Sequence, residues 1–153
     1  MSKATKTVIR RALAPLDRMN GLPPDHLVRK IQETIIPYEV CYLRNQERLE
    51  AALEKILSIR RQEVSQLSAH DAHSLVKALE VPSMALVAEM ILRSALHRKE
   101  SRGFHYREDH PLTDNIEWLR WIMVQKEGEG MRVWAEEFPT PYIQPPREIY
   151  PPR

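Results

Sequence analysis

The sequence contains few glycines and no glycine-rich phosphate-binding motif. Only 4 of its 153 residues are glycine, against 12 prolines. Neither G-x-G-x-x-G nor G-x-x-x-x-G-K-S/T occurs, although a backbone can approach a pyrophosphate or a triphosphate closely only where glycines cluster. This absence argues against a nucleotide-binding enzyme that works alone. We expect no catalytic residue and no cofactor-binding residue on this chain.

Cysteine and histidine are also too sparse to suggest a metal centre. The single cysteine, Cys41, cannot form an internal disulfide and excludes a multi-cysteine metal site. The histidines form no H-E-x-x-H pattern, and His70-x-x-His73 lacks an obvious third ligand. We therefore predict no metal site. Because Cys41 falls on the apolar stripe of a predicted helix, we expect a packed thiol rather than a reactive one.

Long apolar runs and a strong excess of one charge are absent as well. No stretch approaches the length of a transmembrane helix, and the N-terminus has no apolar signal-peptide core. The formal net charge is only +2, whereas a nucleic-acid-binding domain is usually strongly basic. We expect no nucleic-acid partner and no direct membrane insertion. The predicted location is the cytoplasm, or the cytoplasmic face of a membrane complex reached through partner subunits.

Apolar periodicity predicts a mainly α fold, with an antiparallel three-helix bundle over residues 25–110. Residues 1–24 form a basic N-terminal arm, which is either a short helix or a flexible leader. The first helix of the bundle follows Pro23-Pro24, and Pro37 should kink or break it. Asn45 is placed to cap the second helix.

The third helical region begins near Asp71 and should be interrupted at Val81-Pro82. From Met84 to Leu96 it is apolar around most of its circumference, which is typical of a helix buried between others. Gly103 is expected to terminate it.

The apolar period changes after Pro111. Residues 118–125 and 131–138 are aromatic and β-branched, and Glu127-Gly128-Glu129-Gly130 separates them, so residues 111–138 are predicted to hold a β-hairpin. Residues 139–153 contain six prolines and should form an extended, polyproline-like tail that lies over a neighbouring surface.

The densest polar segment, residues 99–111, supplies the candidate functional residues. Arginine forks bind carboxylates or phosphates bidentately, so an interface or anion-binding role is reasonable. Alternatively, Arg102 and Arg107 pair with Glu100, Glu108 or Asp109 and fix the connection to the hairpin. The candidates for an interface or anion-binding site are Arg102, His105, Arg107, Glu100, Ser101 and Gly103.

This segment resembles a signature of the succinate dehydrogenase and fumarate reductase flavoprotein family, which includes L-aspartate oxidase. The resemblance lies in the C-terminal helical domain, where a helix runs into R-x-E-S-R-G-x-H-x-R-x-D-x-P. The matching residues are Arg98, Glu100, Ser101, Arg102, Gly103, His105, Arg107, Asp109 and Pro111, followed by Asp114, Asn115, Trp118 and Leu119. Residues 44–49 resemble the family's R-N/D-x-x-G-L turn, with Arg48 in place of the glycine.

The resemblance implies that FAD and the catalytic residues belong to a flavin-binding domain supplied elsewhere. This chain would then be the C-terminal domain or a split subunit of an FAD-dependent oxidoreductase, with Arg102, His105 and Arg107 at or near the flavin-domain interface. An iron–sulfur subunit is the further partner that the resemblance implies. Two alternatives remain: an adenylylsulfate-reductase-like C-terminal domain, whose ending is similar, and a free-standing helical protein-interaction module.

Overall fold

The computed structural model describes residues 2–151, and its backbone forms two compact units. The first unit comprises residues 2–35 and 54–89, and the second comprises residues 36–53 and 90–151. Two helices, α4 (Gln46–Ser58) and α5 (Ala72–His97), pass from one unit into the other. None of the helices among the described residues is long and apolar enough to span a membrane.

The first unit begins with a helix, which answers the open question about the basic arm. Helix α1 (Lys3–Leu13) starts at Ser2, whose Oγ accepts a hydrogen bond from the Thr5 amide at 3.1 Å. A 3-10 turn (Ala14–Asp17) follows. Helix α2 (Pro24–Ile35) comes next, and α4 is extended by a π-helical turn (Ile59–Glu63) and a 3-10 turn (Val64–Gln66). The buried apolar residues of this unit include Leu27, Ile31, Ile56, Ile59, Val81 and Ala85.

Gly21 is required where the segment before α2 passes the segment after α4. Leu22 donates its amide to the Gln66 carbonyl at 2.7 Å and bridges Leu67 in parallel. A Cβ added at Gly21 would lie 2.4 Å from the Gln66 carbonyl oxygen and 2.7 Å from Cβ of Ser68. Only a glycine lets the two backbones approach this closely.

The two prolines predicted to interrupt helices have different effects. Helix α2 ends at Ile35, and the short helix α3 (Tyr38–Cys41) begins after Pro37, so the predicted break is present. In contrast, α5 continues through Pro82, and the predicted interruption there is wrong. Proline removes only one backbone donor. The helix around it is held by the buried residues Val81 and Ala85, while the Pro82 ring is exposed.

Two other expectations are also wrong. Cys41 is exposed rather than packed, because the helix restarts after Pro37 and the apolar stripe of α2 does not continue through α3. The apolar segment of α5 is not buried on all sides, since Leu86, Val87 and Ile91 are exposed.

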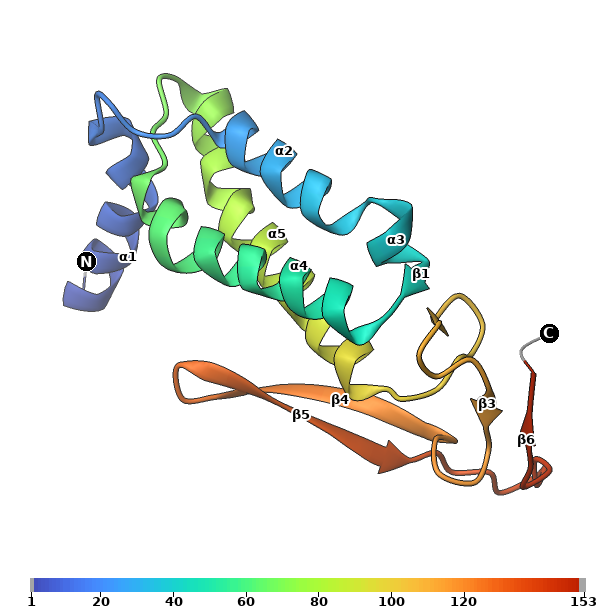
Figure 1. Ribbon diagram of the computed structural model, residues 1–153. Helices are drawn as coiled ribbons and strands as arrows, with labels where there is room; N and C mark the ends of the chain where they lie inside the picture. The colour runs from blue at the N-terminus through green and yellow to red at the C-terminus, as the bar shows by residue number, and fades with distance from the viewer. Residues whose placement is uncertain (1, 152–153) are drawn as a thin grey trace. The chain divides into compact units, whose positions relative to one another are not determined.

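Short strands and a long hairpin characterise the second unit (Figure 1). Strand β1 (Leu43–Arg44) pairs in parallel with β2 (Tyr106–Arg107), and β3 (Thr113–Asp114) pairs antiparallel with β6 (Ile149–Tyr150). Strands β4 (Arg120–Glu127) and β5 (Gly130–Glu137) form an antiparallel hairpin, with Gly128 at φ 57° in its turn. The predicted hairpin is therefore present.

The chain is a helical fold with additional strands. The antiparallel packing of three helices stays a prediction, as does the extended tail. Residues 152 and 153 of that tail lie outside the described residues.

Candidate functional site

The segment that follows α5 folds into a tight loop around Ser101. The Ser101 Oγ accepts a hydrogen bond from the Arg107 amide at 2.8 Å and donates one to the His110 carbonyl at 2.9 Å. The Thr113 hydroxyl donates to the Ser101 carbonyl at 2.6 Å. Ser101 is fully buried, so a side chain with one donor and two acceptor sites satisfies backbone groups on both sides of the loop.

Gly103 lies at the tip of this loop rather than at the end of α5, which ends at His97. Its φ of 56° places it in the left-handed region. Arg102 and His105 exchange two backbone hydrogen bonds, of 2.8 and 3.0 Å, across the turn. The expected helix terminator is thus a turn glycine.

Arg107 connects this loop to the end of α5. Only 1% of the residue is exposed. Its Nε and Nη2 donate to the two carboxylate oxygens of Asp109, both at 2.7 Å, and its Nη1 donates to the Ala95 carbonyl at 2.9 Å and the Arg98 carbonyl at 3.3 Å. The guanidinium therefore satisfies carbonyls at the negative end of the helix dipole, where a buried cation is stabilised.

Asp109 also contacts the start of α4, so the ion pair with Arg107 extends to that helix. Its Oδ2 also accepts a hydrogen bond from the Gln46 amide at 2.9 Å, in the first turn of that helix. The hydrogen bond from Arg107 holds the pKa of the Asp109 carboxyl well below its ordinary value, and the Gln46 amide acts in the same direction. As predicted, Asn45 caps α4, because its Oδ1 accepts from the Arg48 amide at 2.9 Å. One bidentate ion pair thus joins the positive end of α4 to the negative end of α5.

Glu100 is the centre of a second buried cluster. It is 1% exposed and accepts hydrogen bonds from the Arg98 guanidinium, from Arg102 Nε at 2.9 Å and from the Asp114 amide at 2.8 Å. Arg102 also donates to Asn115 Oδ1 at 2.8 Å. Burial acts to lower the pKa of Arg102, but the hydrogen bond and charge of Glu100 outweigh it and raise the pKa.

His105 is held as a neutral imidazole between two arginines. Its Nδ1 is 2.7 Å from Arg44 Nη1, and its Nε2 is 3.4 Å from the Arg98 carbonyl. A guanidinium can only donate, so Nδ1 accepts and the proton lies on Nε2. Burial lowers the pKa of His105 to about 4, and the charge of Arg44 contributes to the same shift. Burial also lowers the pKa of Arg44, with Arg107 adding to the effect.

The six candidate residues therefore occur together in one loop, and the arginines among them pair with carboxylates of the same segment. Arg102 pairs with Glu100 and Arg107 pairs with Asp109. Their participation in an interface stays a prediction. The six candidates leave out four of their side-chain partners. Arg98 and Asp109 lie close by in the chain and pair with Glu100 and Arg107. The other two contacts are those of Arg44, which is 61 residues away from His105 in the chain, and of Asn115 with Arg102. No short-range pattern in the sequence marks either contact.

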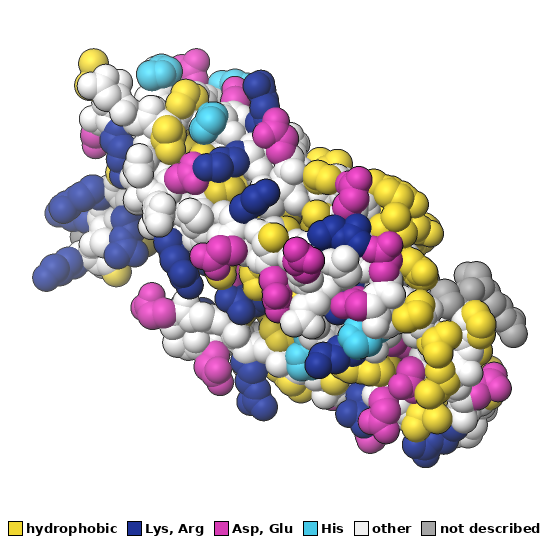
Figure 2. Space-filling model, viewed as in Figure 1, with side chains coloured by type: hydrophobic (Ala, Val, Ile, Leu, Met, Phe, Trp, Pro, Cys, Tyr) yellow, Lys and Arg dark blue, Asp and Glu magenta, His cyan; other side chains and the backbone are white. Residues whose placement is uncertain are grey.

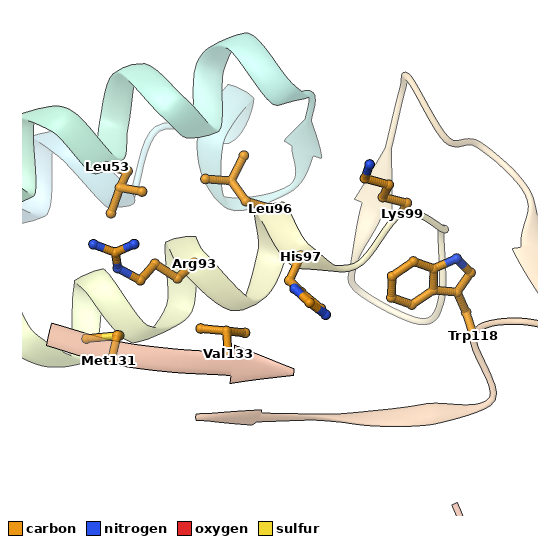
Figure 3. Close-up of a pocket in the computed structure, with 8 residues that line it drawn as sticks. All are labelled: Leu53, Arg93, Leu96, His97, Lys99, Trp118, Met131 and Val133. Atoms are coloured by element: carbon orange, nitrogen blue, oxygen red, sulfur yellow. The ribbon is translucent and has the colours of Figure 1, made fainter. Parts of the chain in front are cut away.

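A cavity of about 640 Å³ lies beside this loop in the second unit (Figure 3). Helices α4 and α5 and strand β5 contribute aliphatic side chains to its lining. The cations Arg93 and Lys99 come from the last turns of α5 and from the residues just after it. His97 packs edge-to-face against Trp118, with ring centroids 6.2 Å apart. The lining residues are Leu53, Arg93, Leu96, His97, Lys99, Trp118, Met131 and Val133.

A second cavity, also of about 640 Å³, is an apolar groove between α2 and α5 in the first unit. We call it the α2–α5 groove. Its lining residues are Ile31, Gln32, Ile35, Val76, Leu79, Glu80, Ser83, Met84, Val87 and Ala88. Val76, Leu79 and Val87 are large apolar side chains left exposed along one side of α5.

Within residues 2–151, no three His, Cys, Asp or Glu side chains gather closely enough to hold a metal ion.

The loop and its helices define a helical domain in which ion pairs hold the loop against the helix ends. Similarity to known proteins identifies the family of this domain. Residues 29–150 match the family model described as the C-terminal part of the fumarate reductase flavoprotein. The chain therefore belongs to the fumarate reductase flavoprotein C-terminal family.

Several curated proteins resemble this chain. An "uncharacterized FAD-dependent oxidoreductase" of Methanocaldococcus jannaschii is 35% identical over 126 residues, which cover 80% of this chain and 22% of that protein. A polypeptide of the CoM/CoB fumarate reductase of Methanothermobacter marburgensis is 36% identical over 95 residues, 60% of this chain and 17% of that polypeptide. An L-aspartate oxidase of Yersinia pestis is 43% identical over 75 residues, 49% of this chain and 13% of that enzyme. The chain thus spans about a fifth of the length of the curated relatives it matches.

Solved structures show the same fold. A variant of E. coli quinol fumarate reductase FrdA gives a TM-score of 0.78 over 97% of this chain and 27% of that chain, at 19% identity. The Mycobacterium smegmatis Sdh1 complex in its apo form gives a TM-score of 0.77 over 92% of this chain and 25% of that chain, at 21% identity.

Proposed function

We propose that this chain completes an FAD-dependent oxidoreductase of the succinate dehydrogenase and fumarate reductase type by packing on a flavin-binding domain supplied elsewhere. That domain would hold FAD and carry out the chemistry, whereas this chain would supply structure. In the same proposal, α2, α4 and α5 form the antiparallel bundle and the proline-rich tail lies over a neighbouring surface. The assembly would lie in the cytoplasm or at the cytoplasmic face of a membrane complex, and it would include an iron–sulfur subunit.

The α2–α5 groove is the observation that carries this proposal. Its walls consist mainly of aliphatic side chains, and Val87 in the groove is 52% exposed. An exposed apolar surface of this kind marks a place where another protein packs. A free-standing module with satisfied helix faces would not leave it open, so the groove favours a domain that lacks its main partner.

The loop tip is a second place where the partner domain would contact this chain. Phe104 is 87% exposed beside Gly103, and the ion pairs of Arg102 and Arg107 hold the loop beneath it. A rigid loop that presents an exposed aromatic ring suits an interface, because little conformational entropy is lost when the ring is buried. The contacts of Arg102, His105 and Arg107 would then position the interface rather than bind substrate.

The experiment is a binding titration between this chain and its FAD-loaded flavin-binding partner. The partner for this experiment is a flavin-binding polypeptide found encoded beside this chain, or a flavin-binding segment upstream if the two are parts of one protein. We expect a one-to-one complex by analytical ultracentrifugation and no flavin absorbance in this chain alone. Val87→Asp should weaken the complex at least tenfold, because it places a charge in a desolvated apolar groove.

Glu54→Gln is the matched control, since Glu54 is exposed on α4 and lines neither cavity. It should leave the affinity unchanged. FAD bound by the isolated chain would overturn the proposal, as would a complex whose affinity is the same with Val87→Asp as with the unmodified chain.

A further inference from the structure

Helix α1 is divided into an apolar half and a basic half. At 100° per residue, Val8, Ile9, Ala12 and Leu13 fall on one side of the helix. The four cations, Lys3, Lys6, Arg10 and Arg11, fall on the other side. None of the eleven residues of the helix is buried. Amphipathic helices normally bury their apolar side in the core of their own domain, and this one does not.

The apolar half of α1 is left open in the described part of the chain. Val8 is 66% exposed, and Ile9 and Leu13 are 42% and 45% exposed. Leu16, in the 3-10 turn that continues the helix, is exposed as well. The helix lines neither the α2–α5 groove nor the cavity beside the loop, so its apolar half is a separate surface.

The basic half of α1 has no acidic residue to balance it. The first acidic residue of the chain is Asp17, which lies beyond the helix. Within residues 2–151, none of Lys3, Lys6, Arg10 and Arg11 forms an ion pair or a side-chain hydrogen bond. Figure 2 shows Lys and Arg side chains gathered over α1. Four cations on one short helix repel one another and favour an anionic surface.

We propose that α1 binds to an anionic lipid surface, with its axis in the plane of the membrane. The apolar half would enter the boundary between headgroups and acyl chains, and the cations would lie at the level of the lipid phosphates. This shallow attachment needs no membrane-spanning helix, but it departs from the expectation that the chain does not insert directly into a membrane. A protein partner that packs on the apolar half alone would leave the four cations crowded together. A lipid surface contacts both halves at once, which is why the pattern favours it over an acidic protein.

The size of α1 predicts a weak and reversible attachment. Eleven residues make a helix of about 16 Å. Such a helix would bury only a few aliphatic side chains in the lipid. Each cation near an anionic leaflet strengthens binding about fivefold, and salt screens this contribution. The helix would therefore hold the chain at a membrane only where anionic lipids are abundant.

The test is sedimentation of the full chain with vesicles. We expect the chain to bind phosphatidylcholine vesicles that contain phosphatidylglycerol, and to bind pure phosphatidylcholine vesicles far more weakly. The double variant Lys6→Gln, Arg10→Gln should weaken binding to the mixed vesicles about 30-fold. Ile9→Ser with Leu13→Ser should weaken it at least tenfold, because it removes two of the three large aliphatic side chains of the apolar half.

The matched control is Lys55→Gln with Arg61→Gln, which removes the same charge from exposed positions outside α1. It should bind like the unmodified chain, and an unchanged far-UV circular dichroism spectrum will show that every variant folds. Equal binding by the control and the α1 variants, or no binding to the mixed vesicles, would overturn the proposal. Binding of α1 to polyglutamate or to DNA but not to the vesicles would overturn it too. None of these results affects docking of a flavin domain in the α2–α5 groove.

Discussion

Replacing Arg107 with methionine should destabilise the domain far more than replacing an exposed arginine. The guanidinium is 1% exposed and donates to the Asp109 carboxylate and to the carbonyls of Ala95 and Arg98. Breaking a buried ion pair by removing one partner costs about 3–5 kcal/mol. The Asp109 side chain is 30% exposed and can rehydrate, so we expect a loss near the lower end, about 3 kcal/mol.

The assay is urea unfolding at neutral pH, followed by far-UV circular dichroism, with the free energy of unfolding taken from linear extrapolation. Arg61→Met is the control, because Arg61 is exposed. It should change the free energy of unfolding by no more than about 0.5 kcal/mol. Arg107→Lys keeps the charge but loses the bidentate geometry and should lie between the two. A loss below about 1 kcal/mol for Arg107→Met would refute the idea that this ion pair connects the ends of α4 and α5.

Two further predictions concern the loop and a close backbone approach. Burial holds the pKa of His105 near 4 in the fold, against 6.5 ordinarily. Above pH 6.5 the imidazole is neutral in both the folded and the unfolded chain, so the stability contribution of His105 is complete there. It should be lost as the pH falls towards 4, by at most about 3 kcal/mol. Urea midpoints measured across this window should fall less steeply for His105→Gln, and identical slopes would contradict the assignment. Gly21→Ala should cost about 2–3 kcal/mol, because its Cβ would meet the Gln66 carbonyl. A Cβ at Gly103 would have no atom within 4 Å, so Gly103→Ala should cost only about 1 kcal/mol, for its left-handed backbone. A larger loss of stability for Gly103→Ala than for Gly21→Ala would contradict this prediction.

The two prolines illustrate what local sequence can and cannot predict about this fold. Pro37 and Pro82 both follow an apolar residue within a helical pattern, and the pattern predicts an interruption at each. The helix breaks at the first and continues through the second. The outcome depends on the flanking residues, since Val81 and Ala85 are buried, whereas Ile36 and Tyr38 are exposed. Burial of this kind is a tertiary property, which periodicity alone does not reveal.

The candidate site shows a similar division. The density of charge in residues 99–111 was enough to locate the loop, because so many ionisable groups seldom occur together without contacting one another. The pattern could not say which groups pair. Arg44 reaches His105 only because β1 pairs with β2, and that pairing connects segments about 60 residues apart. The exposed face of α5 could not be predicted for a related reason. An apolar circumference predicts that a helix is buried, but it does not say whether the same chain or another molecule buries it.

The pairing of β3 with β6 has a consequence for how this family can vary. Residues 115–148, which include the whole hairpin, leave the loop and return to it at neighbouring positions. Asn115 reinforces this closure, because its side chain donates to the Pro146 carbonyl at 2.9 Å and its amide donates to the Glu148 carbonyl at 3.1 Å. Insertions or deletions at the hairpin turn therefore leave the entry and exit points of the segment unchanged. A change in the length of the hairpin turn would therefore leave the ion pairs beside it in place.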